Sequence, residues 1–592
     1  MARHNGSAEL TSALTSCRTA FVGVALMSGL VNVLYLTGSF FMLEVYDRVI
    51  PSRSVPTLIG LMALALALYA FQGALEAIRS RILARIGASL DEALSGRVFD
   101  VVVRAPLKAA VPGDGLLPLR DLDQIRAFLS GTGPSAFFDL PWLPIYLGVC
   151  FLFHPLIGVA ALGGAVFLAG VTWLTDRATR KPARAATGHG QRRNGLAESG
   201  RRNAEVLAAL GMQGRFRTRW ALANRDYMDA QQRTADVAGG LGAVSKVFRM
   251  ALQSGVLALG AWLVIQGQAT AGIIIASSIL VSRALAPAEL AIANWKGFVQ
   301  ARQSWARLSD LLVRIPDGAA RHALPAPMRT LSVEAVAIAP PGAQRVVVSE
   351  VSFALSAGQG LGVIGPSASG KSSLVRALIG VWPPVRGKVR LDGAALDQWD
   401  PAELGPHLGY LPQEAELFAG TIGENIARFD PDAAPEAVIA AAHAAGIHEM
   451  VLRLPEGYDT WVGEGGAGLS SGQRQRVGLA RALYRDPFLV ILDEPNANLD
   501  AEGENALTRA ILGVRARGGI CIVVAHRPSA LAALDLVLMM ADGRAQAFGP
   551  KDEVFKRVLR AAPDPSQPSS SQGYVPAIPS QAPAPHALQE SA

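Results

Sequence analysis

Charged residues are scarce in this chain. Its 592 residues are 50% hydrophobic and only 17% charged, with a mean hydropathy of +0.28, whereas soluble globular proteins carry about 25% charged residues. The deficit predicts membrane-embedded segments and excludes a disordered or collagen-like chain. Cysteine is also rare. The three residues Cys17, Cys150 and Cys521 lie far apart, which excludes a disulfide framework and is typical of buried thiols rather than of a metal site.

Lysine is the third scarcity. Only 8 of the 55 basic residues are lysine, although the formal net charge is +7. The position of the positive charge is therefore more informative than its sum, and we expect no nucleic-acid partner.

Four long uncharged runs predict six membrane spans. Residues 19–43 and 55–75 are each long enough for one span, which needs about 20 apolar residues. The runs 140–175 and 250–282 are too long for one span, because 36 residues would form a helix of about 54 Å against a hydrocarbon core of about 30 Å. Each is interrupted by a turn that contains Pro or Gly, so each predicts a helical hairpin.

Loop charges predict the orientation of the spans. The loops 76–135 and 176–246 contain 8 and 14 Lys or Arg residues, whereas the connections 44–54, 153–155 and 267–270 contain 2, 0 and 0. By the positive-inside rule, the two long loops and both termini are cytoplasmic. Apolar residues recur at helical spacing in these loops, which predicts that the membrane helices continue into the cytoplasm. Because further spans follow, the first span is interpreted as an uncleaved helix rather than a signal peptide.

Two charged residues, Asp139 and Arg283, lie near the ends of predicted spans. Each could line a pathway, because intramembrane charge is usually functional. The simpler interpretation, which we favour from the sequence, is that these side chains reach to the membrane interface.

A soluble α/β domain is predicted after the spans. Short β-like runs at 360–364, 488–492 and 520–524 alternate with helical segments, which is typical of a largely parallel sheet. The last stretch is dominated by Pro, Ser, Ala and Gln and is predicted to be disordered. The predicted parts are a short cytoplasmic N-terminus (1–18), a six-helix membrane domain with two long cytoplasmic loops (19–315), a linker (316–330), an ATP-binding domain (331–560) and the tail (561–592).

A phosphate-binding loop follows the first β-like run. Gly365-Pro-Ser-Ala-Ser-Gly-Lys-Ser372 fits GxxxxGK[ST] and precedes a helix-like segment, 373–380. In this context backbone N–H groups bind phosphates, the lysine reaches the β- and γ-phosphates of ATP, and the serine binds Mg²⁺. The predicted loop residues that bind nucleotide are Gly365, Pro366, Ser367, Ala368, Ser369, Gly370, Lys371, Ser372 and Ser373.

An acidic pair, Asp493-Glu494, follows the apolar run 488–492. An acid at the end of a buried strand can hold Mg²⁺, which is the role predicted for Asp493. Glu494 can then orient or deprotonate the attacking water. The alternative, a solvated acidic pair, fits an exposed turn better than the end of an apolar run.

Between these two elements stands Leu469-Ser-Ser-Gly-Gln473, followed by Arg474-Gln-Arg476. At this point the chain resembles ABC transporters, whose signature reads LSGGQ in most members. The resemblance implies a six-span ABC exporter fold (type IV, or type I exporter) followed by the P-loop nucleotide-binding domain, and hydrolysis of ATP. It also implies three sets of site residues. They are Glu494, His526 and Gln413 for catalysis; Ser470, Ser471, Gly472, Gln473 and Asp500 for nucleotide binding; and Ser372, Gln413 and Asp493 for Mg²⁺.

In the resemblance, Gln413 matches the Q-loop, Asp500 the D-loop and His526 the switch histidine that senses the γ-phosphate. Ala368 departs from the family pattern, because glycine is more usual inside the P-loop. A methyl group is tolerated there if this residue keeps a negative φ.

The signature predicts a second copy of the chain. A P-loop covers one side of the γ-phosphate, and Ser470 with the backbone of Gly472, at a helix start, can bind the other side. The P-loop of the same domain already uses its own helix. A homodimer with two composite ATP sites is therefore predicted.

The membrane half is similar to type I secretion ATPases. Their first hairpin resembles Phe41-Met-Leu-Glu-Val-Tyr-Asp-Arg-Val-Ile-Pro-Ser-Arg-Ser54, and the protease and lipase exporters resemble Arg202-Asn-Ala-Glu-Val206 and Pro340-Pro-Gly-Ala-Gln344. Only 18 residues precede the first span, which leaves no room for the N-terminal peptidase or peptidase-like domain of some exporters. The expected cargo is therefore an unfolded or repeat-containing protein with an uncleaved C-terminal signal.

The resemblance also implies partners and a location. The partners are the lipid bilayer, a secreted protein substrate, a periplasmic membrane-fusion (adaptor) protein and a TolC-like outer-membrane channel. The location is the bacterial inner membrane, with the nucleotide domain in the cytoplasm. Two alternatives stay open, an exporter or flippase of lipids, drugs or other small amphiphiles, and a nucleotide-gated channel or regulator that transports nothing.

Overall fold

The chain consists of a helical unit, Met1–Ala319, and an α/β unit, Ala320–Ala592. The computed structural model describes residues 5–108, 115–316, 324–343, 345–525 and 528–561. The tail predicted to be disordered lies outside the described residues from 562 onward, and the finer boundaries predicted from the sequence stay predictions.

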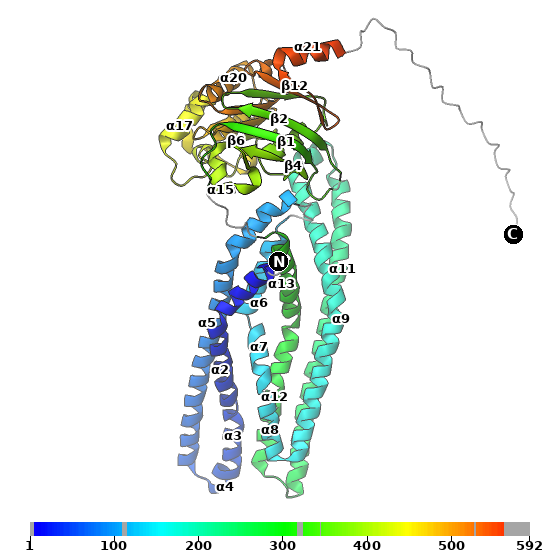
Figure 1. Cartoon of the computed structure of the whole chain (residues 1–592). Coiled ribbons are helices and arrows are strands. Elements are labelled where there is room, and N and C mark those ends of the chain that lie inside the picture. The colour runs from blue at the N-terminus through cyan, green and yellow to red at the C-terminus, as the bar shows by residue number, and fades with distance from the viewer. Residues whose placement is uncertain (1–4, 109–114, 317–323, 344, 526–527, 562–592) are drawn as a thin grey trace, which may run out of the picture. The chain divides into compact units, whose positions relative to one another are not determined.

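The helical unit is built from thirteen α-helices and two short turns of π- and 3₁₀-helix in its described residues (Figure 1). They are α1 (Asn5–Ser16), α2 (Arg18–Leu34), α3 (Thr37–Glu44), the π-turn η1 (Val45–Val49), α4 (Ile50–Ser52), α5 (Val55–Lys108), α6 (Leu117–Ser130), α7 (Gly133–Asp139), the 3₁₀-turn η2 (Leu140–Trp142), α8 (Leu143–Phe153), α9 (Pro155–Arg202), α10 (Ala204–Ala209), α11 (Gln213–Ile265), α12 (Ala271–Ala293) and α13 (Trp295–Arg314).

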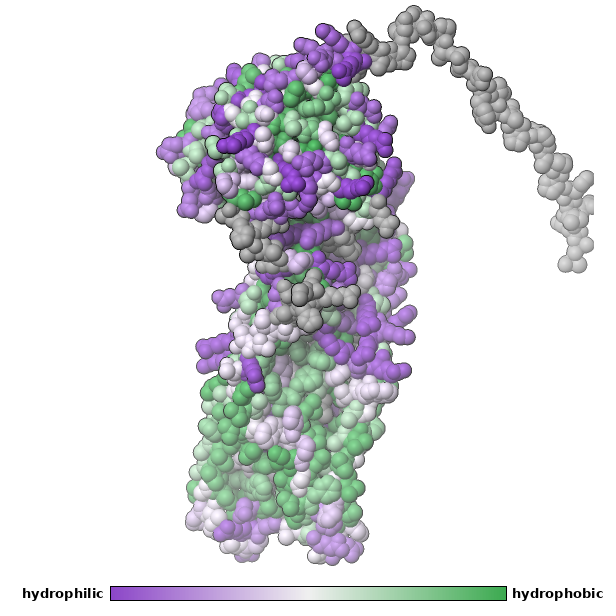
Figure 2. Space-filling view, in the orientation of Figure 1, coloured by the Kyte–Doolittle hydropathy of each residue, from purple (hydrophilic) through white to green (hydrophobic). Residues whose placement is uncertain are grey.

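The six predicted membrane spans are confirmed. Among the described residues, six helical segments are long and apolar enough to cross a membrane: Arg18–Ser52, Val55–Lys108, Gly133–Phe153, Pro155–Arg202, Gln213–Ile265 and Ala271–Ala293. Figure 2 shows hydrophobic side chains covering much of the visible face of these segments. Helices α5, α9 and α11 have 54, 48 and 53 residues, about 70–80 Å at 1.5 Å per residue. They exceed a hydrocarbon core of about 30 Å, as the sequence predicted.

Both predicted hairpins have defined turns. At the first, His154 is extended and its Nδ1 accepts a hydrogen bond from the Leu156 N–H at 3.2 Å, which caps α9. At the second, Asp47 of η1 accepts hydrogen bonds from the Thr270 hydroxyl at 2.6 Å and the Gly272 N–H at 2.8 Å. A carboxylate at a helix N-terminus satisfies free N–H groups and stabilises the helix dipole. Asp47 thereby joins the turn between spans one and two to the start of α12.

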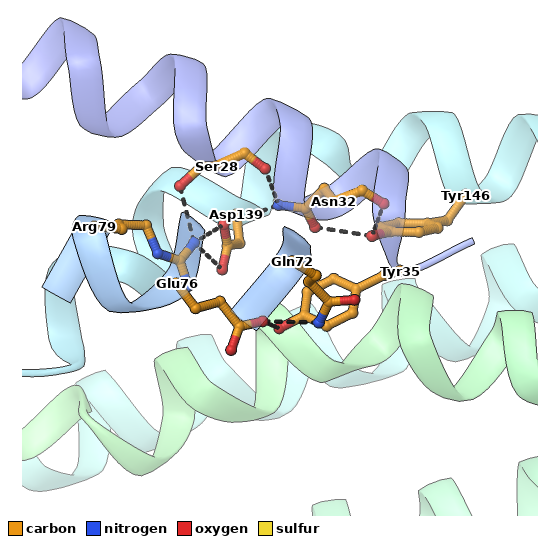
Figure 3. Close-up of polar contacts among 8 residues, drawn as sticks. All are labelled: Ser28, Asn32, Tyr35, Gln72, Glu76, Arg79, Asp139 and Tyr146. Atoms are coloured by element: carbon orange, nitrogen blue, oxygen red, sulfur yellow. Dashed lines mark hydrogen bonds and ion pairs between the residues drawn. The ribbon is translucent and has the colours of Figure 1, made fainter. Parts of the chain in front are cut away.

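Asp139 does not reach the interface as expected, but is buried among four helices (Figure 3). Its Oδ1 lies 2.9 Å from Nη1 of Arg79, which also donates to the Ser28 hydroxyl at 3.0 Å. Asn32 donates to the same carboxylate at 2.9 Å, and its own Oδ1 accepts from Tyr146 at 2.9 Å. A buried carboxylate is stable only when it is paired and hydrogen-bonded. The network ties α2, α5, α7 and α8 together.

The second charged residue near a span end has a different environment. Arg283 is exposed in the single chain, and its guanidinium carbon lies 4.7 Å from the centroid of the Tyr35 ring. The Tyr35 hydroxyl donates to Glu76 at 2.8 Å, and Gln72 donates to the same carboxylate oxygen at 2.9 Å (Figure 3). Arg283 therefore adds a cation–π contact beside a second polar cluster.

Arg79→Met should destabilise the protein strongly, because it leaves the Asp139 carboxylate buried without its cation. We expect a loss of about 3–5 kcal/mol. The double variant Arg79→Met/Asp139→Leu removes both charges and should lose less stability than Arg79→Met, although it forms no ion pair. Thermal unfolding of the purified full chain in detergent measures both, and a double variant less stable than Arg79→Met would contradict this account.

The α/β unit contains twelve strands and eight α-helices in its described residues, with short 3₁₀ turns between them. They are β1 (Thr330–Ile338), β2 (Val348–Ser356), β3 (Gly360–Ile364), α14 (Lys371–Leu378), β4 (Arg386–Leu391), β5 (Ala394–Ala395), α15 (Pro401–Leu404), β6 (Leu408–Leu411), β7 (Gly420–Thr421), α16 (Ile422–Ile426), α17 (Pro435–Ala444), α18 (His448–Leu452), β8 (Trp461–Val462), α19 (Ser471–Leu483), β9 (Leu489–Asp493), α20 (Ala501–Ala516), β10 (Ile520–Val524), β11 (Leu536–Ala541), β12 (Arg544–Pro550) and α21 (Lys551–Ala561).

The predicted parallel sheet is present. Six strands lie in the order β12-β11-β3-β10-β9-β6, and all neighbours are parallel except the edge pair β11 and β12. β3 and β10 match their predicted runs, whereas β9 begins one residue later and includes Asp493. A four-stranded antiparallel sheet, β2-β1-β4-β5, was not predicted. The parallel strands are buried on both faces, as in other sheets covered by helices.

Candidate active site

The phosphate-binding loop leaves the carboxyl end of β3 and enters α14, which begins at Lys371, two residues earlier than predicted. Gly370 has a φ of 94°, and a Cβ there would lie 2.7 Å from Cγ2 of Val348. A Cβ on Gly365 would lie 2.1 Å from the carbonyl oxygen of Met540. Only glycine fits at either position, which explains the spacing of the two glycines in the motif.

The Lys371 ammonium is folded back onto this loop. The side chain is almost fully buried, and its Nζ donates to the carbonyl oxygens of Gly365 and Pro366, both at 2.9 Å. Burial lowers the pKa of Lys371, while the carboxylates of Glu494 and Asp493 act in the opposite direction. The loop therefore holds a buried cation whose present partners are neutral carbonyls, an arrangement that favours an incoming anion.

Ala368 does not keep the negative φ that the sequence analysis required for a methyl group. Its φ is 65°, in the left-handed region. For a residue with a Cβ this conformation costs roughly 1–2 kcal/mol. The loop geometry therefore overrides the preference of alanine, and the strain lies within the predicted phosphate site.

Asp493 ends β9 beside Ser372 of α14. Its side chain is buried and shares a hydrogen bond with Ser372. Within the described residues, its Oδ1 is buried without a hydrogen-bond partner. Burial raises the pKa of Asp493, and the hydrogen bond from Ser372 acts in the opposite direction. A carboxylate and a hydroxyl, with one oxygen unpartnered, match the oxygen ligands that Mg²⁺ prefers.

Glu494 and Gln413 meet at the same edge of the sheet. Gln413 follows β6, and its Nε2 donates to Oε2 of Glu494 at 3.1 Å. The Glu494 backbone has a φ of 50°, and its N–H donates to the Val524 carbonyl at the end of β10. Because the carboxyl ends of parallel strands meet at one edge, residues 81 positions apart become neighbours. His526, two residues after β10, lies outside the described residues, and its role stays a prediction.

The signature begins α19, as predicted. Ser470 is the N-cap: its hydroxyl accepts from the Gln473 N–H at 3.3 Å, and Gln473 Oε1 accepts from the Ser470 N–H at 2.8 Å. This reciprocal pair is a capping box. Ser470 and Ser471 are exposed. A Cβ on Gly472 would lie 2.8 Å from the Asn498 carbonyl, so that glycine allows α19 to approach the segment after β9.

Asp500, which the resemblance predicts to be the D-loop residue, lies beside the signature. It caps α20 by accepting from the Gly503 N–H at 2.8 Å, and it accepts a second hydrogen bond from Arg476 of α19. The Gly503 hydrogen bond and the Arg476 cation lower the pKa of Asp500. A pocket of about 650 Å³ is lined by Ser470, Ser471, Gly472, Gln473 and Asp500, among others. Its described lining includes no P-loop residue, so the chain presents its predicted nucleotide ligands as two separate sets.

Gln475 was missed by the sequence analysis. It is buried in α19; its Nε2 donates to the Pro495 carbonyl at 2.7 Å, and its Oε1 accepts from the Asn498 N–H at 3.2 Å. It therefore fixes the signature helix to the segment that follows Asp493-Glu494. A signal was available, because Gln475 stands at helical spacing with the buried Leu479 and Ala482 and is the polar member of an apolar face.

A six-span helical unit and an α/β unit with P-loop, acidic pair and signature define an ABC transporter. The chain matches the ABC transporter transmembrane region over residues 21–285 and the ABC transporter family over residues 348–497. It is also similar in structure to a bacterial Atm1-family ABC exporter with ATP bound, with a TM-score of 0.78, 23% identity, and coverage of 93% of this chain and 99% of that chain. That likeness shows the fold alone.

Sequence comparison narrows the class. The chain is 62% identical over 554 residues to the type I secretion system ATP-binding protein PrsD of Rhizobium meliloti (strain 1021), covering 94% of this chain and 95% of that protein. It is 30% identical over 545 residues to the cyclolysin secretion/processing ATP-binding protein CyaB of Bordetella pertussis (strain Tohama I), and the match covers 91% of this chain and 76% of that protein. The chain thus belongs to the type I secretion group of ABC transporters, and is an ATP-binding, ATP-hydrolysing, multi-pass membrane protein.

Asp493→Asn should stabilise the nucleotide-free protein while removing its stabilisation by Mg²⁺ and ATP. Burial raises the folded-state pKa of Asp493, so the wild type loses stability as the pH rises from the ordinary value of 3.8 through the raised value. Asparagine has no such loss. Each kcal/mol gained should raise the Tm by about 2–4 °C. Thermal unfolding between acidic and neutral pH checks this: an advantage that does not grow with pH would contradict it.

Ala368→Gly should stabilise the protein by up to about 1 kcal/mol, because glycine adopts a φ of 65° without the Cβ clash. The matched control is Ala440→Gly in the exposed middle of α17, which should cost about 1 kcal/mol. Thermal unfolding of both variants checks that the two substitutions change the stability in opposite directions. Destabilisation by Ala368→Gly would contradict the claim that the backbone of Ala368 is strained.

Proposed function

We propose that this protein is the inner-membrane component of a type I secretion system, and that it exports unfolded or repeat-containing proteins with an uncleaved C-terminal signal. The observation that carries the proposal is the 62% identity to a type I secretion system ATP-binding protein across 94% of the chain. The name of the second relative, which refers to cyclolysin secretion, supports a protein cargo.

The chain works as a homodimer with two composite ATP sites. The exposed Ser470 and Ser471 and the backbone of Gly472 bind the γ-phosphate held by the P-loop of the other copy. The separation of the P-loop from the signature pocket within one chain supports this arrangement. Free N–H groups at the start of α19 favour an anion, and Gln473 and Asp500 hold the signature and D-loop in place.

Lys371 acts by exchanging partners. Its ammonium leaves the carbonyls of Gly365 and Pro366 and binds the β- and γ-phosphates, together with the N–H groups of the P-loop. Ser372, Asp493 and Gln413 would hold Mg²⁺, and the ion would supply positive charge against the phosphates. The unpartnered Oδ1 of Asp493 supports this assignment.

Glu494 accepts a proton from the attacking water. The amide of Gln413, 3.1 Å from Oε2 of Glu494, positions that carboxylate, and His526 senses the γ-phosphate. ATP shifts the population toward a closed pair of nucleotide domains, and the long helices α5, α9 and α11 transmit closure to the spans. Hydrolysis then resets the cycle.

The distribution of charge supports the proposed location. The positively charged loops 76–135 and 176–246 lie in the cytoplasm with the nucleotide domain, and the short connections face the periplasm. On the periplasmic side, the protein joins an adaptor protein and an outer-membrane channel. The similarity to type I secretion proteins supports these partners.

Glu494→Gln should abolish steady-state ATP hydrolysis and secretion while ATP still binds and traps the dimer. The measurement is export of a reporter fused to a C-terminal repeat-protein signal, in cells that supply an adaptor and an outer-membrane channel. Removal of one general base typically costs about 10²–10⁴-fold in rate.

Lys371→Ala is the matched comparison, because it should weaken nucleotide binding itself. Near-normal ATPase activity of Glu494→Gln would refute the role of Glu494. Stimulation of wild-type ATPase by lipids or small amphiphiles, with no reporter export, would instead favour the flippase alternative.

A further inference from the structure

One face of helix α9 stays exposed along both its membrane-spanning part and the part that follows. Its side chains recur at the three- and four-residue spacing that places them on one side of a helix. Thr175 and Thr179, which are buried, lie on the opposite side of α9. We call the exposed face the α9 outer face; its members are Val159, Leu162, Val166, Trp173, Arg177, Arg180 and Arg184.

The chemistry of the α9 outer face changes where the membrane span ends. The uncharged run of span four ends at Thr175. The face is apolar before that point, and Trp173 is its last apolar side chain. Tryptophan is enriched where the hydrocarbon core meets the headgroups. The guanidinium carbon of Arg177 lies 5.8 Å from the centroid of the Trp173 ring, so the first cation of the face stands beside this aromatic ring.

The arginines of the α9 outer face lie at the depth of lipid phosphates. At 1.5 Å per residue, Arg177, Arg180 and Arg184 stand about 3, 8 and 14 Å beyond Thr175 along α9. A headgroup layer of about 5–8 Å covers each side of the hydrocarbon core. Arg177 and Arg180 therefore reach the phosphates directly. Arg184 lies beyond them but within about one Debye length, where its charge still acts.

Positive charge exceeds negative charge on this part of α9. Residues 173–184 include four basic side chains and one acid, Asp176. The Asp176 carboxylate pairs with Arg180 at 3.1 Å. Among the residues that the structure describes, neither Arg177 nor Arg184 has a carboxylate partner. The face therefore keeps an excess of cations that favours an anionic surface.

An anionic phospholipid matches both parts of this face. Its acyl chains would contact the apolar stripe from Val159 to Trp173, and its phosphate would meet the arginines. A second copy of the chain fits less well, because a two-fold interface centred on the face would bring like charges together. A zwitterionic headgroup carries its own cation and leaves the excess charge of the arginines without a counter-charge.

We propose that the α9 outer face binds anionic phospholipids in the leaflet next to the loops 76–135 and 176–246. Arg177 and Arg180 bind the phosphates, Trp173 marks the boundary of the hydrocarbon core, and Arg184 adds attraction from beyond the headgroups. Binding at this level fixes the depth of α9 in the membrane and thus the point where its cytoplasmic part begins. The inference does not depend on which cargo the protein exports.

The test is native mass spectrometry of the purified full chain, titrated with phosphatidylglycerol or with phosphatidylcholine of the same acyl chains. A basic residue at an anionic membrane surface contributes about fivefold in affinity. With two arginines at headgroup level, wild type should bind phosphatidylglycerol about 20-fold more tightly than phosphatidylcholine. Arg177→Gln/Arg180→Gln should lower this ratio at least fivefold, whereas Arg177→Lys/Arg180→Lys keeps both charges and should keep most of the preference.

The matched control is Arg192→Gln. Arg192 is an exposed arginine of the same helix, about 26 Å beyond Thr175 along α9, and its removal should leave the preference as in wild type. Equal affinity of wild type for the two lipids would overturn the proposal, as would an unchanged ratio in Arg177→Gln/Arg180→Gln. An equal loss in Arg192→Gln would also overturn it, because the preference would then reflect total charge. Competition by soluble glycerol phosphate would assign the arginines to a free phosphate ligand instead.

Discussion

The α/β unit depends on charged groups that are buried where parallel strands end. Lys371 and Asp493 are both removed from water at the carboxyl edge of the sheet. Burial lowers the pKa of Lys371 and raises the pKa of Asp493, so it favours the neutral form of each group. Such groups are costly in a nucleotide-free domain. In the proposed nucleotide site, phosphates and a divalent cation would supply the missing counter-charges, and the binding energy of the ligand would offset a cost built into the fold. The two residues with a strained, positive φ lie next to these groups: Ala368 stands shortly before Lys371 in the loop, and Glu494 directly follows Asp493.

The helical unit meets the same constraint without a ligand. Arg79 and Asp139 are buried together, and hydrogen bonds from Ser28 and Asn32 complete their shell. This ion pair is internal to one chain and joins spans at fixed positions.

Much of this architecture could be predicted from the sequence, because its strongest signals are local. Uncharged runs gave the six spans, and a P-loop has a fixed spacing beside a buried strand. The signature placed Ser470 at a helix start, where its capping box now lies. Three features could not be predicted in the same way. The partner of Asp139 is 60 residues away, the φ of Ala368 is set by its loop, and the β2-β1-β4-β5 sheet pairs strands whose register shifts along their length.

The sequence indicated candidate site residues one by one, but it did not show which of them lie next to each other. Motif matching named Gln413 and Glu494 separately, but their hydrogen bond depends on β6 and β9 being neighbours in the sheet. Gln475 was overlooked because no motif position calls for it, although its place on the buried face of α19 was visible.

The unbroken length of α9 and α11 also limits how these helices can evolve. Each residue added to a helix turns everything beyond it by about 100° and advances it by about 1.5 Å. One residue inserted in α9 between Thr175 and Ala183 would rotate Thr175 away from Ala183 and Lys296, and these three residues now line the same pocket. An insertion of seven residues, close to two full turns, would nearly restore the facing. Homologous chains should therefore vary in these helices by substitution and keep their length, while changes of length collect in the turns that join them.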